Sequence, residues 1–293
     1  MINSVINFSL KSLCIVCVNC FVLISGYFGI KFKIRSFANL LFQLIFWSLV
    51  CIAIVSLPIF PTTPNGTLLW EGIKWGWFPR SYMILFVLSP LLNAFCQSCS
   101  PTQLGRYTLV YYLLSIICGY FLLWPDFNEG MSVLSLIGLY LLGAYLRKTN
   151  LPIFNLGAKY NLAIYFIGGI SLVLLSLVLK RLGVKVSPYG YLNPVVVLMS
   201  VFFFLSFAKI NLGHKRWINF IAASAFSIYL FHYNPLIFPY VREMWQNINI
   251  HFGMYVSLLA ALVSFVMIYM FCLIIDRVRI FLFDCISGLF NKA

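Results

Sequence analysis

The residues with the clearest chemical potential lie early in the chain, in the stretch FVLISGYFGIKFKIRSF, residues 21–37. An apolar run is interrupted by Ser25-Gly26-Tyr27. It then ends in three cations at alternate positions, Lys31, Lys33 and Arg35. Small residues allow two helices to approach closely, and Tyr offers a hydroxyl inside a bundle. Lys and Arg bind phosphate groups through charge-assisted hydrogen bonds. The stretch therefore predicts either a packed helix with a basic anchor or a site for an anionic ligand.

His232 is the one histidine inside a predicted apolar helix. Counted from Trp217 along a continuous helix, it lies roughly 22 Å from the start of that segment. An ionisable side chain at such depth in a membrane is a functional candidate, because a base can accept a proton from a substrate hydroxyl. The alternative is a neutral histidine bonded to a nearby backbone group or Tyr hydroxyl. No Asp or Glu lies within any predicted span.

A third candidate site is the stretch WGWFPRSY, which sets Trp75 and Trp77 close to Arg80 and Tyr82. Flat aromatic faces suit the apolar C–H faces of sugar rings. A nearby cation could bind an acceptor or stabilise an oxyanion in the transition state. Tryptophan is also enriched at membrane interfaces, so an interfacial belt is the alternative interpretation.

Other chemistry has little support in this sequence. The chain holds nine cysteines, but its CxxC, Cys96 to Cys99, has no second ligand pair at zinc-finger spacing. Cysteine in helices is usually a small apolar packing residue, and we expect no metal site. There is no GxSxG elbow, no phosphate-binding loop of the Walker type, and no GxGxxG followed by an acid.

Composition identifies the elements that must position these residues. Of the 293 residues, 62% are hydrophobic and only 9% are charged. A soluble domain has about 25% charged residues, so the sequence predicts a polytopic membrane protein. The net charge of +14 is then explained by cytoplasmic loops and anionic lipid headgroups, and no nucleic-acid partner is expected.

Nine apolar stretches approach the roughly 20 residues that a membrane-spanning helix needs. They cover residues 12–30, 37–59, 78–96, 107–124, 130–146, 160–179, 192–208, 217–240 and 253–275. The connections are short, and no internal repeat or soluble domain interrupts the series. We therefore expect one all-α transmembrane bundle over residues 1–293, with about nine spans.

The orientation of this bundle follows from its cations. Of the 20 Lys and Arg residues, thirteen fall on the side that holds Lys31 and seven on the side that holds Met1. Cytoplasmic loops carry the excess of Lys and Arg, so Lys31 is predicted inside and Met1 outside. Five of the seven tryptophans then lie outside, more than a belt requires: Trp70, Trp75, Trp77, Trp124 and Trp245.

Several segments together resemble acyltransferase family 3, the integral-membrane O-acyltransferases of bacteria. They occur in the family's order across nearly the whole chain: CFVLISGYFGIK, WGWFPRSYMILFVLSPLLNAF, LIGLYLLGAYLRK and ASAFSIYLFHYNP. The family usually has ten helices, and this chain begins at what looks like the second. The family's first helix normally carries the histidine regarded as catalytic, so the resemblance implies either a gene start upstream of Met1 or a degenerate protein. No residue here matches that histidine, and a chain expressed from Met1 is expected to be inactive.

The resemblance also implies an acyl donor and an acyl acceptor. Acyl-CoA, such as acetyl-CoA, would be the co-substrate, with no tightly bound cofactor. Its expected binding residues are Lys31, Lys33, Arg35, Ser25, Tyr27 and Arg147. The acceptor, a hydroxyl of an envelope glycan, is expected near Trp75, Trp77, Arg80 and Tyr82. The catalytic residue stays unassigned, with His232 as an assisting candidate. The oligomeric state is not predicted.

The function predicted from this sequence is O-acyl transfer, most simply O-acetylation of a cell-surface polysaccharide at the inner membrane. Two alternatives stay open: a transporter or flippase of glycan intermediates, and an inactive remnant. Ion-coupled transport usually uses carboxylates buried within the membrane, and the predicted spans contain none.

Overall fold

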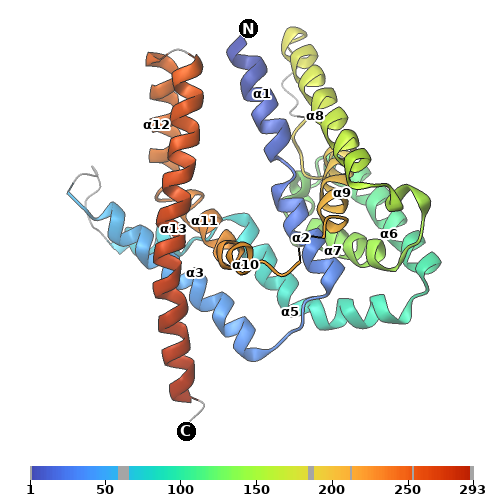
Figure 1. Ribbon diagram of the computed structural model, residues 1–293, viewed down its shortest axis with the longest axis horizontal. Coiled ribbons are helices and arrows are strands. Elements are labelled where there is room, and N and C mark those ends of the chain that lie inside the picture. Colours follow the sequence, from blue (N-terminus) through green and yellow to red (C-terminus); the bar gives the residue numbers. More distant parts are fainter. Residues whose placement is uncertain (1, 59–65, 184–187, 212, 253, 291–293) are drawn as a thin grey trace. The chain divides into compact units, whose positions relative to one another are not determined.

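The computed structural model in Figure 1 describes residues 2–58, 66–183, 188–211, 213–252 and 254–290. The described residues form helices and turns and no strand. By length and composition, six helical segments can cross a membrane: Val5–Phe28, Ile34–Val55, Trp77–Ser98, Pro101–Phe121, Ala158–Arg181 and Tyr255–Gly288. The prediction of an all-α membrane protein is confirmed, whereas the count of nine spans is not.

The chain forms two compact units, each built from separate parts of the sequence. Unit 1 consists of Met1–Phe32 and Ser81–Leu212, and unit 2 of Lys33–Arg80 and Gly213–Ala293. The boundary at Arg80 falls inside helix α5, Trp77–Ser98, so this helix begins in unit 2 and continues in unit 1. The prediction of a single domain stays a prediction.

Unit 1 is a group of helices packed along α2 and α9. Its α-helices are α1 Ile2–Cys14, α2 Cys17–Phe28, α6 Pro101–Ser115, α7 Val133–Lys148, α8 Ala158–Arg181 and α9 Pro194–Ala208. Three short helical segments join them: η1 Ile116–Phe121, η2 Asn128–Gly130 and η3 Pro152–Asn155. Helix α2 packs against α7 and α9, and α8 packs against α9 and α1 (Figure 1).

The closest helix contact in unit 1 depends on two glycines. A Cβ atom added at Gly26 would lie 2.1 Å from the carbonyl oxygen of Tyr140, and one at Gly143 would lie 2.4 Å from that of Leu23. Helices α2 and α7 therefore approach backbone to backbone, which larger residues would prevent. The glycine of the Ser25-Gly26-Tyr27 notch thus serves helix packing.

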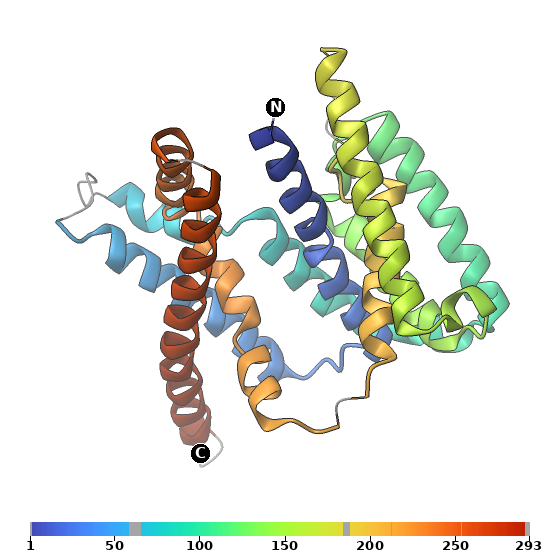
Figure 2. The same ribbon diagram turned by 45° about the horizontal axis from the view of Figure 1, so that its top comes forward.

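Unit 2 is arranged around two long helices, α3 Ile34–Val55 and α13 Met254–Phe290. Four shorter helices complete it: α4 Gly66–Ile73, α10 Arg216–Ala222, α11 Ala225–His232 and α12 Phe238–His251. Helix α11 packs against both α3 and α13, and α4 packs against α3. Helix α12 lies along the first half of α13 in both views (Figures 1 and 2).

The continuous helix expected over residues 217–240 is wrong. The structure divides this segment into α10, α11 and the start of α12, with turns at 223–224 and 233–237. Pro235 disfavours helical geometry at Asn234, and the Asn234 side chain accepts a hydrogen bond from the backbone N–H of Leu236 at 3.0 Å. The depth of His232, which was counted along an unbroken helix from Trp217, has no basis in this geometry.

Candidate functional site

The notch residue Ser25 contacts a residue predicted for the other substrate. Its hydroxyl lies 3.1 Å from the hydroxyl of Tyr82 on α5, and it also donates to the carbonyl of Phe21 at 3.0 Å. The ring of Phe21 packs edge-on against Tyr82 at 5.1 Å. The structure therefore brings together Ser25, predicted to bind the donor, and Tyr82, predicted to bind the acceptor.

A large apolar groove lies beside the notch. Its volume is about 670 Å³, and its lining residues come from α2 and α9: Cys20, Ile24, Tyr27, Phe28, Phe203, Phe204, Phe207 and Ala208. The Tyr27 ring packs edge-on against Phe204, with centroids 5.1 Å apart. Tyr27 thus lines a groove whose volume lies in the range of small-molecule binding pockets.

Arg147 places a cation next to this groove. From the last turn of α7, its Nη1 atom donates to the carbonyls of Tyr27 and Phe28, each at 3.3 Å. These carbonyls end α2, where the helix offers them no further backbone N–H donor, so the Arg147 guanidinium acts as a cap. Arg147 is exposed.

Arg35, in contrast, belongs to unit 2 and has an acidic partner. Its Nη2 lies 3.5 Å from Asp284 on α13 and donates to the hydroxyl of Ser287 at 3.1 Å. The pair borders a polar crevice of about 200 Å³, whose lining also includes Asn39. An anionic acyl donor that bound in this crevice would have to displace Asp284 from Arg35.

The six residues predicted to bind the donor are divided between the two units. Ser25, Tyr27, Lys31 and Arg147 belong to unit 1, whereas Lys33 and Arg35 belong to unit 2. All four cations are exposed. Within unit 1 the structure brings Tyr27 and Arg147 together: Tyr27 lines the groove, and Arg147 bonds its backbone carbonyl.

Trp75 is the predicted acceptor residue with the most defined surroundings. Its indole N–H donates to the hydroxyl of Ser48 on α3 at 3.0 Å. The two side chains border a narrow slot of about 10 Å³, enough for about one water molecule. The slot is also lined by Trp47, Tyr229, Tyr233 and Asn234. Its walls therefore come from α3, from α11 and the turn after it, and from the chain around the start of α5.

The other predicted acceptor residues are less enclosed. Trp77 is half-buried at the start of α5 and packs edge-on against Phe78 at 5.6 Å. Arg80 is exposed, one turn further along the same helix. Trp75, Trp77 and Arg80 all belong to unit 2, while Tyr82 belongs to unit 1.

His232 ends α11 in a defined tautomer. Its Nδ1 atom lies 2.5 Å from the carbonyl oxygen of Ile228, and because a carbonyl can only accept, Nδ1 carries the proton. In the neutral ring, Nε2 then has the lone pair, and no described residue hydrogen-bonds to it. The ring packs edge-on against Tyr229 and Tyr233, each 6.1 Å away. The histidine is thus held at one nitrogen and available as a base at the other.

The structure also contains a buried charged site that sequence reasoning missed. Helix α13 does not end near residue 275 but continues to Phe290, so Asp276 lies inside a candidate membrane span. The expectation that no acid lies within a span is therefore wrong. Asp276 is fully buried, and its ion-pair partner Arg279 is 4% exposed.

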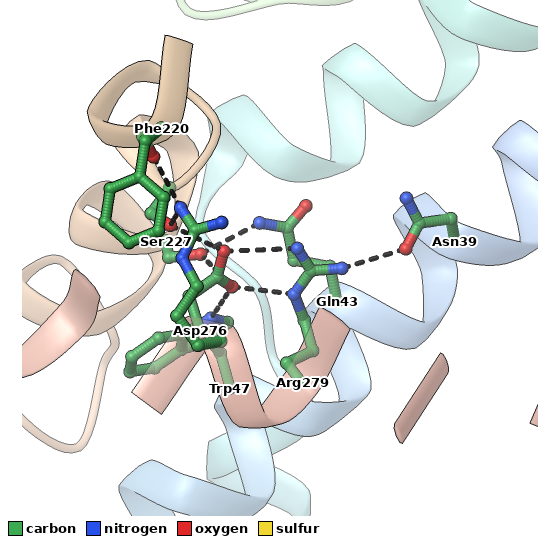
Figure 3. Close-up of polar contacts among 9 residues, drawn as sticks. Asn39, Gln43, Trp47, Phe220, Ser227, Asp276 and Arg279 are labelled. Carbon is green, nitrogen blue, oxygen red and sulfur yellow. Dashed lines mark hydrogen bonds and ion pairs between the residues drawn. The ribbon is translucent and has the colours of Figure 1, made fainter. Parts of the chain in front are cut away.

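The carboxylate of Asp276 accepts five hydrogen bonds from three helices and the turn before α11 (Figure 3). Arg279 donates through Nε at 2.6 Å and through Nη2 at 3.1 Å. The hydroxyls of Ser227 and Ser224 donate at 2.6 and 2.9 Å. The indole N–H of Trp47 donates at 3.3 Å.

A second layer of polar groups surrounds this pair. Asn39 accepts from Nη1 of Arg279 at 2.8 Å, and Gln43 donates to the Ser227 hydroxyl at 2.9 Å (Figure 3). Asn39, Gln43 and Trp47 recur at every fourth position of α3, on one face of an apolar helix. That spacing was the sequence signal that could have located the site.

The fold and these sites together define the class of the protein: an all-helical chain with membrane-spanning helices and polar groups inside its helical units is an integral membrane protein. Residues 2–277 match the family model Acyl_transf_3, described as an acyltransferase domain. The chain belongs to this family, acyltransferase family 3, and the protein is an acyltransferase. No curated protein and no solved structure matches the chain.

Proposed function

We propose that this protein is an O-acyltransferase of the inner membrane. It moves an acyl group, most simply acetyl, from cytosolic acyl-CoA to a hydroxyl of a cell-envelope polysaccharide. The observation that carries the proposal is the family match over residues 2–277, which makes the chain an acyltransferase along nearly its whole length.

The groove between α2 and α9 supports binding of a CoA thioester. The acyl and pantetheine parts of this donor are narrow and largely apolar, and the lining residue Tyr27 offers a hydroxyl among aromatic side chains. The phosphates need cations, and Arg147 lies at the end of α2 beside Tyr27. Further exposed cations for the anionic nucleotide are Arg35, Lys33 and Lys31. To bind a phosphate, Arg35 must first give up its ion pair with Asp284.

The surroundings of His232 support the proton transfer that the reaction needs. The acceptor oxygen attacks the thioester carbon, the new C–O bond forms, and the C–S bond breaks. Nε2 of His232 takes the hydroxyl proton and then returns it to the CoA thiolate. Arg80 supplies positive charge for the developing oxyanion, and Trp75 and Trp77 offer aromatic faces to the sugar. The first-helix histidine of the family has no counterpart in this scheme.

The test is to delete the gene in its host and to measure base-labile acyl esters on the envelope polysaccharide by NMR. We expect the esters to disappear on deletion and to return when the gene is supplied on a plasmid. Return of the esters with a chain expressed from Met1 would overturn the expectation that this chain is inactive. Unchanged esters in the deletion strain would refute the proposal. Loss of exported polysaccharide, rather than of its esters, would instead favour the transporter.

The transporter alternative gains one observation from the structure, because Asp276 is a carboxylate buried within a candidate span. Its oxygens, however, already accept five hydrogen bonds and are paired with Arg279. A coupling carboxylate must bind and release its ion, and this one is occupied by protein groups. The acyltransferase proposal therefore stands as the better supported function.

A further inference from the structure

Asp276 connects parts of unit 2 that the backbone alone would leave independent. An ion pair between Asp276 and Arg279 needs only one turn of α13, because residues at i and i+3 are neighbours on a helix. The other hydrogen-bond donors to Asp276 lie outside α13. Ser224 lies in the turn before α11, Ser227 in the first turn of α11, and Trp47 on α3. The carboxylate therefore links α13, α11 and α3 at one point, and we call Asp276 with these hydrogen-bond donors the joint.

Arg279 and its neighbour Arg277 reinforce the same joint. Arg279 reaches Asn39 on α3 with the guanidinium nitrogen that it does not use for Asp276. Arg277 stacks on the ring of Phe220 at 3.8 Å and donates to that residue's carbonyl and to the Ser224 hydroxyl. The end of α10 and the beginning of α11 are thus both held by side chains of α13.

This joint lies next to the slot and to His232. Trp47 donates to Asp276 and also lines the slot, beside the Ser48 that binds Trp75. Helix α11 has eight residues, and His232 lies five residues after Ser227, about 7.5 Å along the axis. A helix this short moves as a unit, so a bond at its first turn determines where its last residue lies.

We propose that Asp276 is a positioning residue that holds His232 and the α11 side of the slot against α3. The proposal rests on the proposed function, in which His232 takes the proton of the acceptor. Asp276 is not itself the base, because every acceptor position of its carboxylate is already used by Arg279, the two serines and Trp47.

The test compares Asp276→Asn/Arg279→Gln with wild-type protein, both purified in lipid nanodiscs. Removing both charges avoids leaving an unpaired buried cation, which would itself unfold the unit. Both chains also carry His214→Gln and His251→Gln, so His232 is the only histidine that diethyl pyrocarbonate can modify. The measurements are the modification rate of His232 by mass spectrometry, the melting temperature, and kcat and KM for acyl-CoA where transfer is detected.

We expect the double variant to remain folded while the modification rate of His232 rises by about tenfold. We also expect kcat to fall by about 10- to 100-fold, the loss that a small misplacement of a reacting group produces. KM for acyl-CoA changes less than kcat, because Tyr27 and Arg147 lie on α2 and α7, whose described residues make no hydrogen bond to Asp276. Asp284→Asn is the matched control for the modification rate, because Asp284 is 63% exposed on the same helix and its loss leaves the reactivity of His232 unchanged.

A folded double variant with the wild-type modification rate at His232 would overturn the proposal. If the double variant does not fold, Ser227→Ala, which removes only one hydroxyl of α11, takes its place with the same expectation. Absence of transfer in the wild type counts against the proposed function alone, because the reactivity of His232 still tests whether Asp276 holds α11.

Discussion

At the scale of single residues, the two ionisable groups inside unit 2 have opposite surroundings. Asp276 has all of its acceptor positions used by neighbouring donors, and burying such a pair is tolerable only because each charge is compensated. His232 has one nitrogen bonded to its own helix and the other without a partner among the described residues. A saturated group is suited to holding structure, and an unsaturated one to exchanging protons.

This contrast predicts the effect of His232→Gln. Glutamine can donate an N–H to the Ile228 carbonyl but cannot take up a proton, so folding is retained and the base is lost. We expect kcat for acyl transfer to fall by about 100- to 10,000-fold, the usual contribution of a general base. The measurement is transfer of radiolabelled acetyl from acetyl-CoA to isolated envelope polysaccharide.

The matched control is His214→Gln. His214 is exposed and contacts Asn219 in unit 2, so the same chemical change there leaves both folding and transfer at the wild-type level. If His232→Gln transferred acyl groups as fast as this control, His232 would have no role as the base.

At the scale of elements, the structure explains why two helices of unit 1 carry glycine where they cross. The backbone of α2 meets that of α7 at Gly26 and Gly143, with no space for a Cβ atom at either position. The same crossing positions Tyr27 at the groove and Arg147 at the end of α2. Helix packing and the proposed donor site are therefore consequences of one contact.

Gly26→Ala should separate α2 from α7. The added Cβ would meet the Tyr140 carbonyl at 2.1 Å, and a backbone group cannot turn aside as a flexible side chain can. We expect destabilisation by about 1–3 kcal/mol, the usual cost of overpacking. A lower melting temperature in nanodiscs and a higher KM for acyl-CoA would measure the two consequences.

Gly288→Ala on α13 provides the comparison. No heavy atom lies within 4 Å of a Cβ placed there, so alanine gains helix propensity without a clash. We expect this variant to be as stable as the wild type or slightly more stable. Equal melting temperatures for the two alanine variants would contradict the close crossing of α2 and α7.

At the scale of the whole molecule, the distribution of cations predicts how the chain is oriented in the membrane. Lys33 is expected on the cytoplasmic side, which carries most of the Lys and Arg residues, and Trp77 on the outer side. The proposed reaction requires this separation, because acyl-CoA is confined to the cytosol while the glycan acceptor is outside.

The orientation can be tested with Lys33→Cys and Trp77→Cys in a background where the exposed cysteines are replaced by serine. A thiol reagent that cannot cross membranes should label position 77 in intact cells and position 33 only after the cells are opened. Labelling of both positions from the same side would contradict the orientation, and with it the proposed path from cytosolic donor to external acceptor.

The sequence by itself determined the class of fold, because apolar stretches of membrane-spanning length with few charges have no stable alternative to helices in lipid. It also indicated Tyr27, Arg147 and Trp75 as candidate site residues, whose types are unusual in their local context. Their partners could not be predicted, because hydrogen bonds such as Trp75 to Ser48 join residues far apart in the chain.

Only the tertiary structure revealed Asp276 as a buried group. In the sequence, DRVR after an apolar run reads as the charged end of a span, since composition cannot show that Asp276 and Arg279 neutralise each other within a longer helix. The tertiary structure likewise decided that residues 217–240 form three helices rather than one. Ser224 and Asn234 mark the breaks. Ser224 donates to the distant Asp276, whereas Asn234 accepts from the nearby N–H of Leu236 beside Pro235.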